Sequence, residues 1–248
     1  MRNRSCLFMS IALGAALLTP DMARADDRGD EYRLTVFPTY KINEQWTGIG
    51  YLGYVTTPEI DTVTTYLGTG GIWHFKPRWD MWAVLMETRT KVDGSLSNSE
   101  LRPLLGLQYA LSPWGKAKPF DLFRAEYRMI DKVSGDDTSY LRLRNRFGAT
   151  FPIGQKQGTG SWYGLADAEA FYRFDKNLSD LARLRGGIGY IASPRVRIEF
   201  IVHAQFKRPD QDSSFKWTDT IWRINIKVAK DTGLLDRLVG ADADADAD

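Results

Sequence analysis

A two-residue hydrophobic period runs through the chain between about residues 31 and 230, and it limits the possible folds more than any other feature. In RVRIEFIVHAQFK, residues 195–207, apolar side chains alternate with charged or polar ones along the whole segment. This period places the two kinds of side chain on opposite faces of a strand, whereas helical spacing fits the segment poorly. Segments of roughly ten residues with this pattern recur between turns, as in β-barrels. The pattern therefore predicts an all-β protein.

The pattern occurs in successive windows, each of which we interpret as one strand. The expected strands are residues 31–41, 46–56, 63–75, 79–90, 100–111, 119–131, 139–151, 161–174, 181–191, 195–208 and 217–229. Short turns are expected at 41–45, 76–78 and 192–194, and longer polar loops at 90–99, 131–139 and 208–216. These windows give an odd count of eleven, whereas most single-chain bacterial barrels have an even number of strands. We therefore predict a barrel of about 10–12 strands.

Strand length favours a membrane barrel over a soluble sandwich. Strands of about 9–11 residues match a tilted membrane span, whereas soluble strands average about five or six. Aromatic residues also gather near the expected turns: Trp73, Phe75 and Trp79 near one, and Trp114 and Phe120 near another. Aromatic girdles of membrane barrels have this placement. We therefore expect a single antiparallel up-and-down transmembrane β-barrel, with a soluble periplasmic β-protein as an alternative.

The first 25 residues have the features of a signal for export. Arg2 and Arg4 precede an apolar stretch over residues 7–18, and Ala23-Arg24-Ala25 forms a small-x-small cleavage site. We predict a signal peptide at residues 1–25, a barrel at 26–230 and a flexible acidic tail at 231–248, which ends in ADADADAD. The one cysteine falls in the signal peptide. The expected location is the outer membrane of a Gram-negative bacterium.

The polar faces of the central strands predict a charged lumen. In LRLRNRF, residues 141–147, three arginines occupy every second position. If the following hairpin is symmetric, Arg146 lies opposite Asp167 and Arg144 opposite Glu169, and such cross-strand pairs stabilise a sheet modestly. The predicted lumen charge network comprises Arg124, Glu126, Arg128, Arg142, Arg144, Arg146, Asp167, Glu169, Arg183, Arg185, Arg197, Glu199 and His203.

The expected inner faces carry more basic than acidic residues, thirteen against six, and residues 26–230 as a whole carry 29 basic and 24 acidic residues. Two interpretations follow. The charges form an ion-pair network that plugs a narrow barrel, or they form a basic-lined, porin-like passage or pocket for small anionic solutes. Side chains of this length leave little open bore in a barrel of this size. The mild overall charge, without a lysine-rich block, argues against nucleic acid as a partner.

The sequence predicts no catalytic residues. It contains two histidines, His74 and His203, and it lacks G-x-S-x-G, metal-ligand spacing and a phosphate-binding loop. We therefore expect a non-enzymatic protein with no metal and no cofactor, in which His74 is an interfacial side chain. The alternative is an outer-membrane lipid-modifying enzyme that uses His203, which is expected beside Glu199 and Gln205.

Three segments resemble a known family: YKINEQWTGIGYLGY near the start, LRLRNRFGATFP in the middle, and DKNLSDLARLRGGIGYIASPRVRIEF later. The chain resembles the bacterial domain-of-unknown-function family 2490, whose members are regarded as outer-membrane barrels, over most of residues 30–230. The resemblance implies outer-membrane lipids and the barrel assembly machinery as partners, and it carries over no functional residues. Small anions are expected as partners from the basic excess of the inner faces alone. The chain differs from many such barrels in continuing past its last strand instead of ending there on an aromatic residue.

Overall fold

The computed structural model describes residues 29–210, 212–232 and 235. The signal peptide predicted at 1–25 lies outside the described residues, as does most of the tail predicted at 231–248. No helix in the described part is long and apolar enough to cross a bilayer. The strands are β1 (Gly29–Lys41), β2 (Trp46–Thr57), β3 (Thr62–Lys76), β4 (Trp79–Val92), β5 (Ser95–Ala110), β6 (Lys118–Lys132), β7 (Thr138–Ile153), β8 (Trp162–Arg173), β9 (Leu178–Ser193), β10 (Val196–Lys207) and β11 (Lys216–Ala229).

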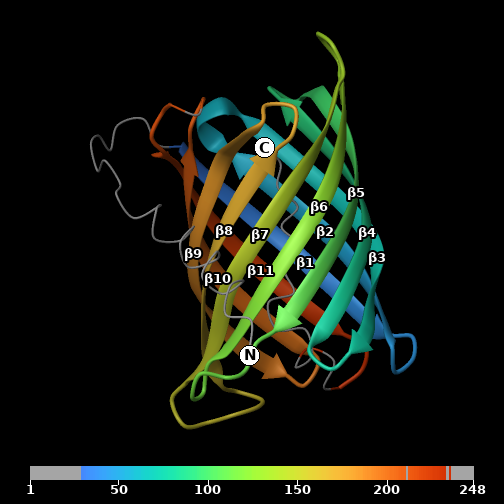
Figure 1. Ribbon diagram of the computed structural model, residues 1–248, viewed down its shortest axis with the longest axis vertical. Helices are drawn as coiled ribbons and strands as arrows, with labels where there is room; N and C mark the ends of the chain where they lie inside the picture. Colours follow the sequence, from blue (N-terminus) through green and yellow to red (C-terminus); the bar gives the residue numbers. More distant parts are fainter. Residues whose placement is uncertain (1–28, 211, 233–234, 236–248) are drawn as a thin grey trace, which may run out of the picture.

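The strands close into one barrel, which confirms the predicted all-β, up-and-down architecture (Figure 1). Each strand pairs antiparallel with its neighbours in sequence, and β1 pairs parallel with β11. The described strands number eleven, which confirms the predicted range of about 10–12. In an up-and-down sheet with an odd number of strands, the first and last strands run in the same direction, and closure therefore requires one parallel pair.

Because the number of strands is odd, β1 begins at one mouth of the barrel and β11 ends at the other. The N-mouth, where β1 begins, carries the connections 58–61, 93–94, 133–137, 174–177 and 208–215. The C-mouth, where β11 ends, carries the connections 42–45, 77–78, 111–117, 154–161 and 194–195. The short turns predicted at 41–45, 76–78 and 192–194 lie at the C-mouth, and the loops predicted at 131–139 and 208–216 lie at the N-mouth. The connection 154–161 is as long as 208–215 but lies at the C-mouth, so long connections occur at both mouths.

The long loop predicted at 90–99 is wrong, because only a two-residue turn separates β4 from β5. β4 and β5 continue through this region and join at Asp93 and Gly94. Both residues have positive φ, 48° and 75°, as in the two-residue turns that match the twist of a hairpin. An Asp-Gly pair favours that turn, so the polar residues on either side remain in strands.

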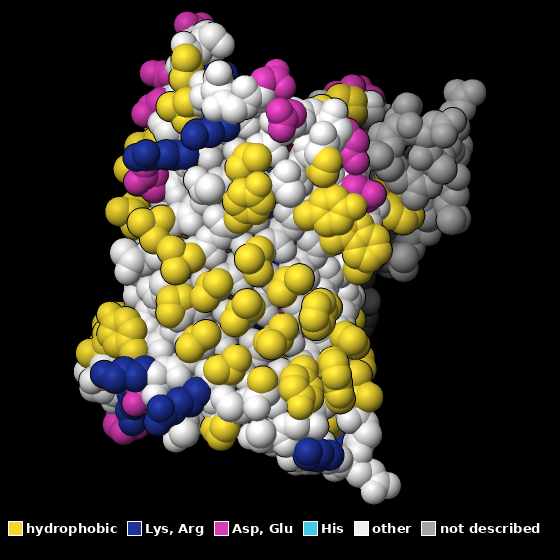
Figure 2. All heavy atoms as spheres, turned by 180° about the vertical axis from the view of Figure 1, so that it is seen from behind, with side chains coloured by type: hydrophobic (Ala, Val, Ile, Leu, Met, Phe, Trp, Pro, Cys, Tyr) yellow, Lys and Arg dark blue, Asp and Glu magenta, His cyan; other side chains and the backbone are white. Residues whose placement is uncertain are grey.

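The outer face is apolar around the middle of the barrel. On β5, Leu101, Leu105 and Leu107 are exposed, whereas the alternate residues Arg102 and Leu104 are buried. Figure 2 shows exposed hydrophobic side chains over the middle of the barrel wall, with Lys, Arg, Asp and Glu side chains towards both ends. The strands contain 12 to 16 residues, about 40–50 Å at 3.3 Å per residue. They are long enough to cross a hydrocarbon core at a tilt.

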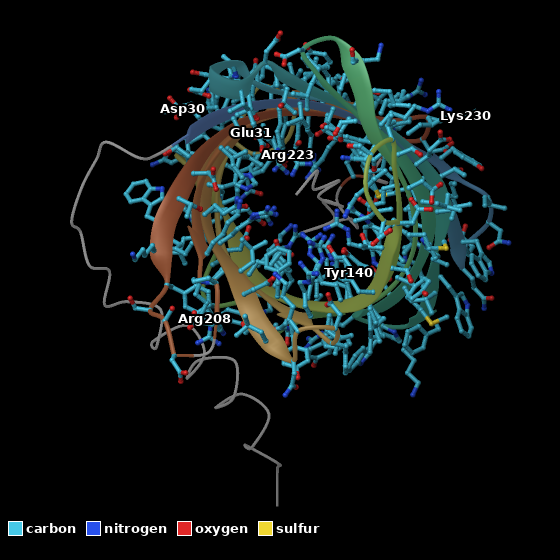
Figure 3. The ribbon with its side chains drawn as sticks, turned by 90° about the horizontal axis from the view of Figure 1, so that it is seen from above. Asp30, Glu31, Tyr140, Arg208, Arg223 and Lys230 are labelled. Atoms are coloured by element: carbon cyan, nitrogen blue, oxygen red, sulfur yellow. The ribbon has the colours of Figure 1, made fainter. Side chains whose placement is uncertain are left out.

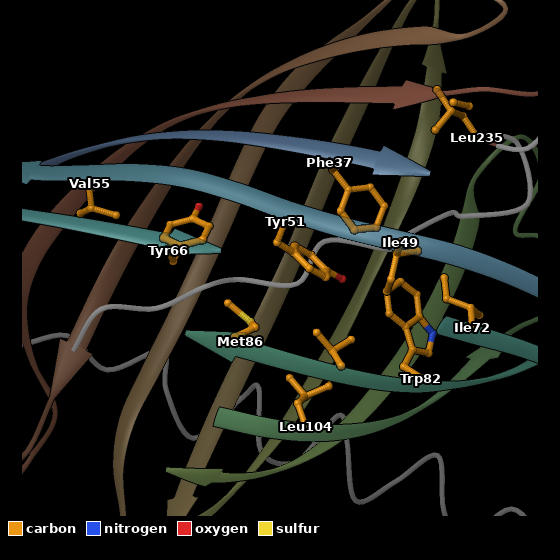
Figure 4. Close-up of a cluster of buried hydrophobic side chains, with 12 residues drawn as sticks. Phe37, Ile49, Tyr51, Val55, Tyr66, Ile72, Trp82, Met86, Leu104 and Leu235 are labelled. Carbon is orange, nitrogen blue, oxygen red and sulfur yellow. The ribbon is translucent and has the colours of Figure 1, made fainter. Parts of the chain in front are cut away.

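The inner face is divided into an apolar part and a charged part. Buried hydrophobic side chains from β1–β5 form a cluster inside the wall (Figure 4), and Leu235 packs into it from beyond β11. Sequence periodicity did not indicate this cluster because both faces of β4 are apolar: Trp82, Val84 and Met86 point inward, and Leu85 points outward. β6–β11 contribute most of the buried charges.

Two adjacent glycines on β3 provide a test of the packing between strands. A Cβ atom on Gly70 would lie 2.1 Å from the carbonyl oxygen of Ala83 on β4, whereas one on Gly71 would have no neighbour closer than 3.6 Å. We expect Gly70→Ala to lower the free energy of unfolding by about 1–3 kcal/mol, because the backbone must move. Gly71→Ala should change it by less than about 0.5 kcal/mol. Urea unfolding of both variants checks this, and equal losses would contradict the close approach of β3 and β4.

Candidate functional site in the barrel interior

The thirteen residues predicted to form the lumen charge network lie on β6–β10. Eleven are buried, whereas Asp167 and Arg197 are half-buried. Viewed along the barrel axis, Tyr140 and Arg223 project towards the lumen from different parts of the wall (Figure 3). Strand alternation accounts for this arrangement, because polar residues at every second position of a barrel strand share its inner face.

Glu126 and Glu169 are the centres of the largest ion-pair cluster. Arg144 joins them, with Nη1 2.9 Å from Glu126 Oε1 and Nη2 2.8 Å from Glu169 Oε1. Arg142 Nη2 lies 2.8 Å from Glu126 Oε2, and Arg124 Nη2 lies 2.7 Å from Glu169 Oε1. The side chains of all five residues are at most 3% exposed. This cluster fills the part of the lumen beside β6–β8.

Two further carboxylates bind two more arginines and a lysine. Glu100 on β5 accepts hydrogen bonds from Arg102 at 2.7 Å and from Arg128 at 2.6 Å. Near the C-mouth, Glu199 accepts hydrogen bonds from Lys227 at 2.8 Å and from the Tyr163 hydroxyl at 2.6 Å. The network therefore extends along much of the barrel.

The register predicted for the β7–β8 hairpin is wrong by two residues. Arg146 lies opposite Glu169, Arg144 opposite Phe171, and Asp167 opposite Gly148. The hairpin is symmetric about residues 157 and 158, the middle of the connection 154–161, whereas the prediction placed its centre at 156 and 157. A two-residue shift keeps every side chain on its original face, so the charges still point inward. Arg144 reaches Glu169 diagonally, and Asp167 instead binds Arg185 on β9 at 2.5 and 2.9 Å.

Buried aromatic rings separate several of the arginines, a feature that was not predicted. The guanidinium carbons of Arg142, Arg144 and Arg183 lie 5.2, 4.5 and 5.0 Å from the centre of the Phe171 ring. Phe120, expected near a membrane interface, is buried, and its ring centre lies 5.3 Å from the Arg146 guanidinium. Such contacts stabilise cations modestly. Phe171 shares the inward alternation of Asp167 and Glu169, which could have indicated its position.

Cations outnumber carboxylates among the buried side chains of the described residues, eleven against four. Half-buried side chains narrow this excess, because eight of them are acidic and three are basic among the described residues. The half-buried acids are Asp30, Glu31, Asp80, Asp121, Asp167, Asp180, Asp219 and Asp231, and the half-buried cations are Arg173, Arg197 and Arg208. Arg33 was missed in the sequence because its place beside Arg223 depends on the parallel β1–β11 pair. The buried cations are Arg33, Arg102, Arg124, Arg128, Arg142, Arg144, Arg146, Arg183, Arg185, Arg223 and Lys227, and the buried carboxylates are Glu100, Glu126, Glu169 and Glu199.

His203 is completely buried, and neither of its ring nitrogens has a hydrogen-bond partner among the described residues. It lies opposite Arg185 on β9. The expected neighbours bond elsewhere: Glu199 to Lys227 and Tyr163, and Gln205 to Arg183 and Asp219. A general base must reach its nucleophile through a hydrogen bond, and His203 reaches none in this part of the chain. The geometry does not favour the enzyme alternative based on His203.

His74 forms a hydrogen-bonded chain at the C-mouth that resembles a hydroxyl–imidazole–carboxylate set. Its Nε2 lies 2.9 Å from Thr47 Oγ1, and its Nδ1 lies 2.6 Å from Asp80 Oδ1. A cavity of about 680 Å³ is lined by His74 and Asp80, whereas Thr47 is 1% exposed and does not line it. A nucleophile must face the substrate, and Thr47 does not face the cavity. The chain of hydrogen bonds from Thr47 through His74 to Asp80 therefore fits a structural role, in which it connects β2, β3 and β4. The described residues contain no group of three or more His, Cys, Asp or Glu side chains that could hold a metal ion.

Comparisons with known proteins give a family match and a distant structural match. No curated protein matches the chain. A solved structure described as "Bacterial polysaccharide outer membrane secretin" is 10% identical, with a TM-score of 0.47, over 77% of this chain and 64% of that chain, less than two thirds of its length. Residues 22–216 match the family described as "Protein of unknown function (DUF2490)". The match spans most of the chain, which therefore belongs to the DUF2490 family, as its three characteristic segments predicted.

Proposed function

We propose that this protein is a non-enzymatic outer-membrane β-barrel whose basic interior admits and binds small anionic solutes. The excess of buried cations over buried carboxylates is the observation that carries the proposal. The proposal includes export by the N-terminal signal and insertion by the barrel assembly machinery of a Gram-negative bacterium.

The outer surface supports placement in a membrane. Exposed apolar side chains cover the middle of the barrel wall (Figure 2), which is the surface that lipid chains solvate in membrane barrels. At the C-mouth, the rings of Trp46, Trp73, Phe75, Trp79 and Tyr109 follow one another across β2–β5 at centroid distances of 4.6–6.4 Å. Aromatic rings favour the boundary between lipid and water, so this row marks one edge of the proposed membrane span.

The interior supports an anionic ligand. Burying positive charge is unfavourable unless negative charge lies nearby, and among the described residues eleven buried cations face four buried carboxylates, with half-buried acids adding further negative charge. Anions that enter from water would supply the remaining negative charge. The central ion pairs around Glu126 and Glu169 are nearly inaccessible, so this barrel suits binding and slow passage of small anions, and a wide aqueous pore does not fit it.

Planar-bilayer recording of the purified full chain under a potassium chloride gradient tests the proposal. The expected result is a small conductance whose reversal potential has the sign of chloride selectivity, because the lumen attracts anions. A protein-free bilayer treated with the same detergent provides the baseline. Cation selectivity, or an absence of conductance from inserted protein, would contradict the admission of anions.

A further inference from the structure

A cavity of about 550 Å³ opens at the N-mouth between the ends of β6–β11. This volume lies within the range of cavities that hold small ligands. Among the described residues that line it, seven are cationic and one, Asp180, is acidic. The lining cations are Arg128, Arg142, Arg173, Lys176, Lys207, Arg208 and Lys216.

The floor of the cavity is held in place by the lumen network. Arg128 and Arg142 are 1% and 2% exposed, and each is bonded to a buried carboxylate, Arg128 to Glu100 at 2.6 Å and Arg142 to Glu126 at 2.8 Å. These bonds orient the guanidinium groups before any ligand arrives. Orientation in advance lowers the entropic cost of binding.

The Tyr140 ring also lies in the wall of this cavity and contacts two of its arginines. The guanidinium carbons of Arg173 and Arg128 lie 3.9 and 5.5 Å from the ring centre. Figure 3 shows Tyr140 pointing into the lumen. The ring therefore helps to hold Arg173 over the cavity.

The acids at the rim offset part of this positive charge. Arg173 bonds to Asp175 at 2.6 Å, and this hydrogen bond lowers the pKa of Asp175, so the carboxylate stays ionised at neutral pH. Lys207 lies 3.3 Å from Asp219, and Lys176 lies 4.0 Å from Asp180. Asp210 and Asp212 belong to the adjacent loop, but of all these acids only Asp180 lines the cavity itself.

The uncharged part of the lining indicates what else a ligand would carry. Leu181 and Pro209 provide apolar surface beside Tyr140, and Ser213 and Thr218 provide hydroxyl groups. A ring with hydroxyl substituents would pack on the apolar surface and exchange hydrogen bonds with these groups. A phosphate attached to that ring would accept charge-assisted hydrogen bonds from the arginines.

We infer that the N-mouth cavity is a binding site for phosphorylated sugars. This inference rests on the proposed function, because it assigns a ligand class and a location to the anions that the interior admits. Phosphorylated sugars have two sources near an outer membrane: free sugar phosphates in solution and the phosphorylated head groups of glycolipids. The ligand chemistry is the same for both, so an experiment must separate them.

Titration calorimetry of the full chain in detergent provides the first test. Glucose 1,6-bisphosphate is expected to bind, inorganic phosphate to bind more weakly, and glucose to show no binding. The double variant Lys176→Gln/Lys216→Gln should weaken bisphosphate binding by about tenfold or more, because charge-assisted hydrogen bonds are lost. The matched control is Lys116→Gln/Lys156→Gln, which removes two lysines from a C-mouth cavity of about 490 Å³ and should change affinity by less than about twofold.

The source of the sugar phosphate is tested by competition. Nanodiscs that contain a bisphosphorylated lipid A should compete with labelled glucose bisphosphate if the head group reaches the cavity, whereas phosphatidylcholine nanodiscs should not. Competition assigns the site to the glycolipid, and bisphosphate binding without competition assigns it to the free solute. Either result supports the inferred ligand class.

Three results would overturn the inference: equal binding of glucose and its bisphosphate, equal losses in the two double variants, or no binding of the bisphosphate. The reversal potential of the same preparations separates this failure from that of the proposed function. If anion selectivity is retained but sugar phosphates do not bind, the inferred site is wrong and the proposed function stands. Binding at the N-mouth without anion selectivity contradicts admission of anions through the interior and leaves the site in place.

Discussion

Glu126→Gln is expected to lower the free energy of unfolding by about 3–5 kcal/mol. Glu126 accepts hydrogen bonds from Arg142 and Arg144 in a part of the lumen where all three side chains are at most 3% exposed. Glutamine keeps the shape of the side chain but removes its charge, which leaves two buried guanidinium groups without that counter-charge. Breaking a buried pair by removing one partner is costly because the other charge remains buried. The measurement is the urea midpoint of the folded, detergent-solubilised barrel.

The matched control for this variant is Glu44→Gln. Glu44 pairs with Lys41 at the C-mouth connection after β1, and their side chains are 80% and 37% exposed. Exposed pairs contribute about 0–1 kcal/mol, so this variant should unfold close to the wild type. If both variants lost the same stability, the interior network would not stabilise the barrel more than a surface pair does.

Leu105→Arg is expected to destabilise the barrel in a bilayer by about 2–4 kcal/mol. Leu105 lies in the middle of β5, points outward and is 61% exposed. In the proposed membrane, that exposed surface faces hydrocarbon, and an arginine there must be moved out of water. In a soluble β-protein, the same substitution would add a charge to a hydrated surface, with an effect within about 0.5 kcal/mol.

Val228→Arg provides the control for the position along the barrel axis. Val228 shares the outward alternation of Trp222 and Ile224 and is 36% exposed, but it lies next to the end of β11 at the C-mouth. Near the interface the cost of a lipid-facing arginine falls to about 0–1 kcal/mol. Equal and small effects at the two positions, measured by urea unfolding in lipid vesicles, would show that the band around Leu105 does not contact hydrocarbon.

The strands of this fold were predictable because alternation is a local property of the sequence. On β5, Leu101 and Leu105 point outward, whereas Arg102 points inward, as the two-residue period required. The same rule placed Glu126 and Glu169 on the inner face. Strand ends were less predictable, since β5 begins at Ser95 in a segment whose polarity suggested a loop.

Features that depend on contacts between distant strands were not predictable by this reasoning. Arg33 comes to lie beside Arg223 because the strand count is odd and β1 must close against β11 in parallel. The hairpin register between β7 and β8 depends on the conformation of 154–161, and a shift of two residues leaves the alternation unchanged. The apolar cluster around Trp82 was hidden because both faces of β4 are apolar, so polarity could not assign its inner side.

The candidate site was likewise indicated only in part by the sequence. The types of charged residue on β6–β10 were visible, but their partners were not: Asp167 binds Arg185 on the next strand, and Phe171 lies among three arginines. The N-mouth cavity combines residues from six strands and their loops, which no local pattern brings together.

The most direct measurement of the central claim, a barrel with lipid outside and charge inside, is fractionation of expressing cells followed by gel electrophoresis with and without boiling. We expect the protein to be recovered with outer membranes and to migrate differently before and after boiling, because a closed membrane barrel stays folded in mild detergent. Recovery in the soluble periplasmic fraction, with the same migration before and after boiling, would contradict this claim.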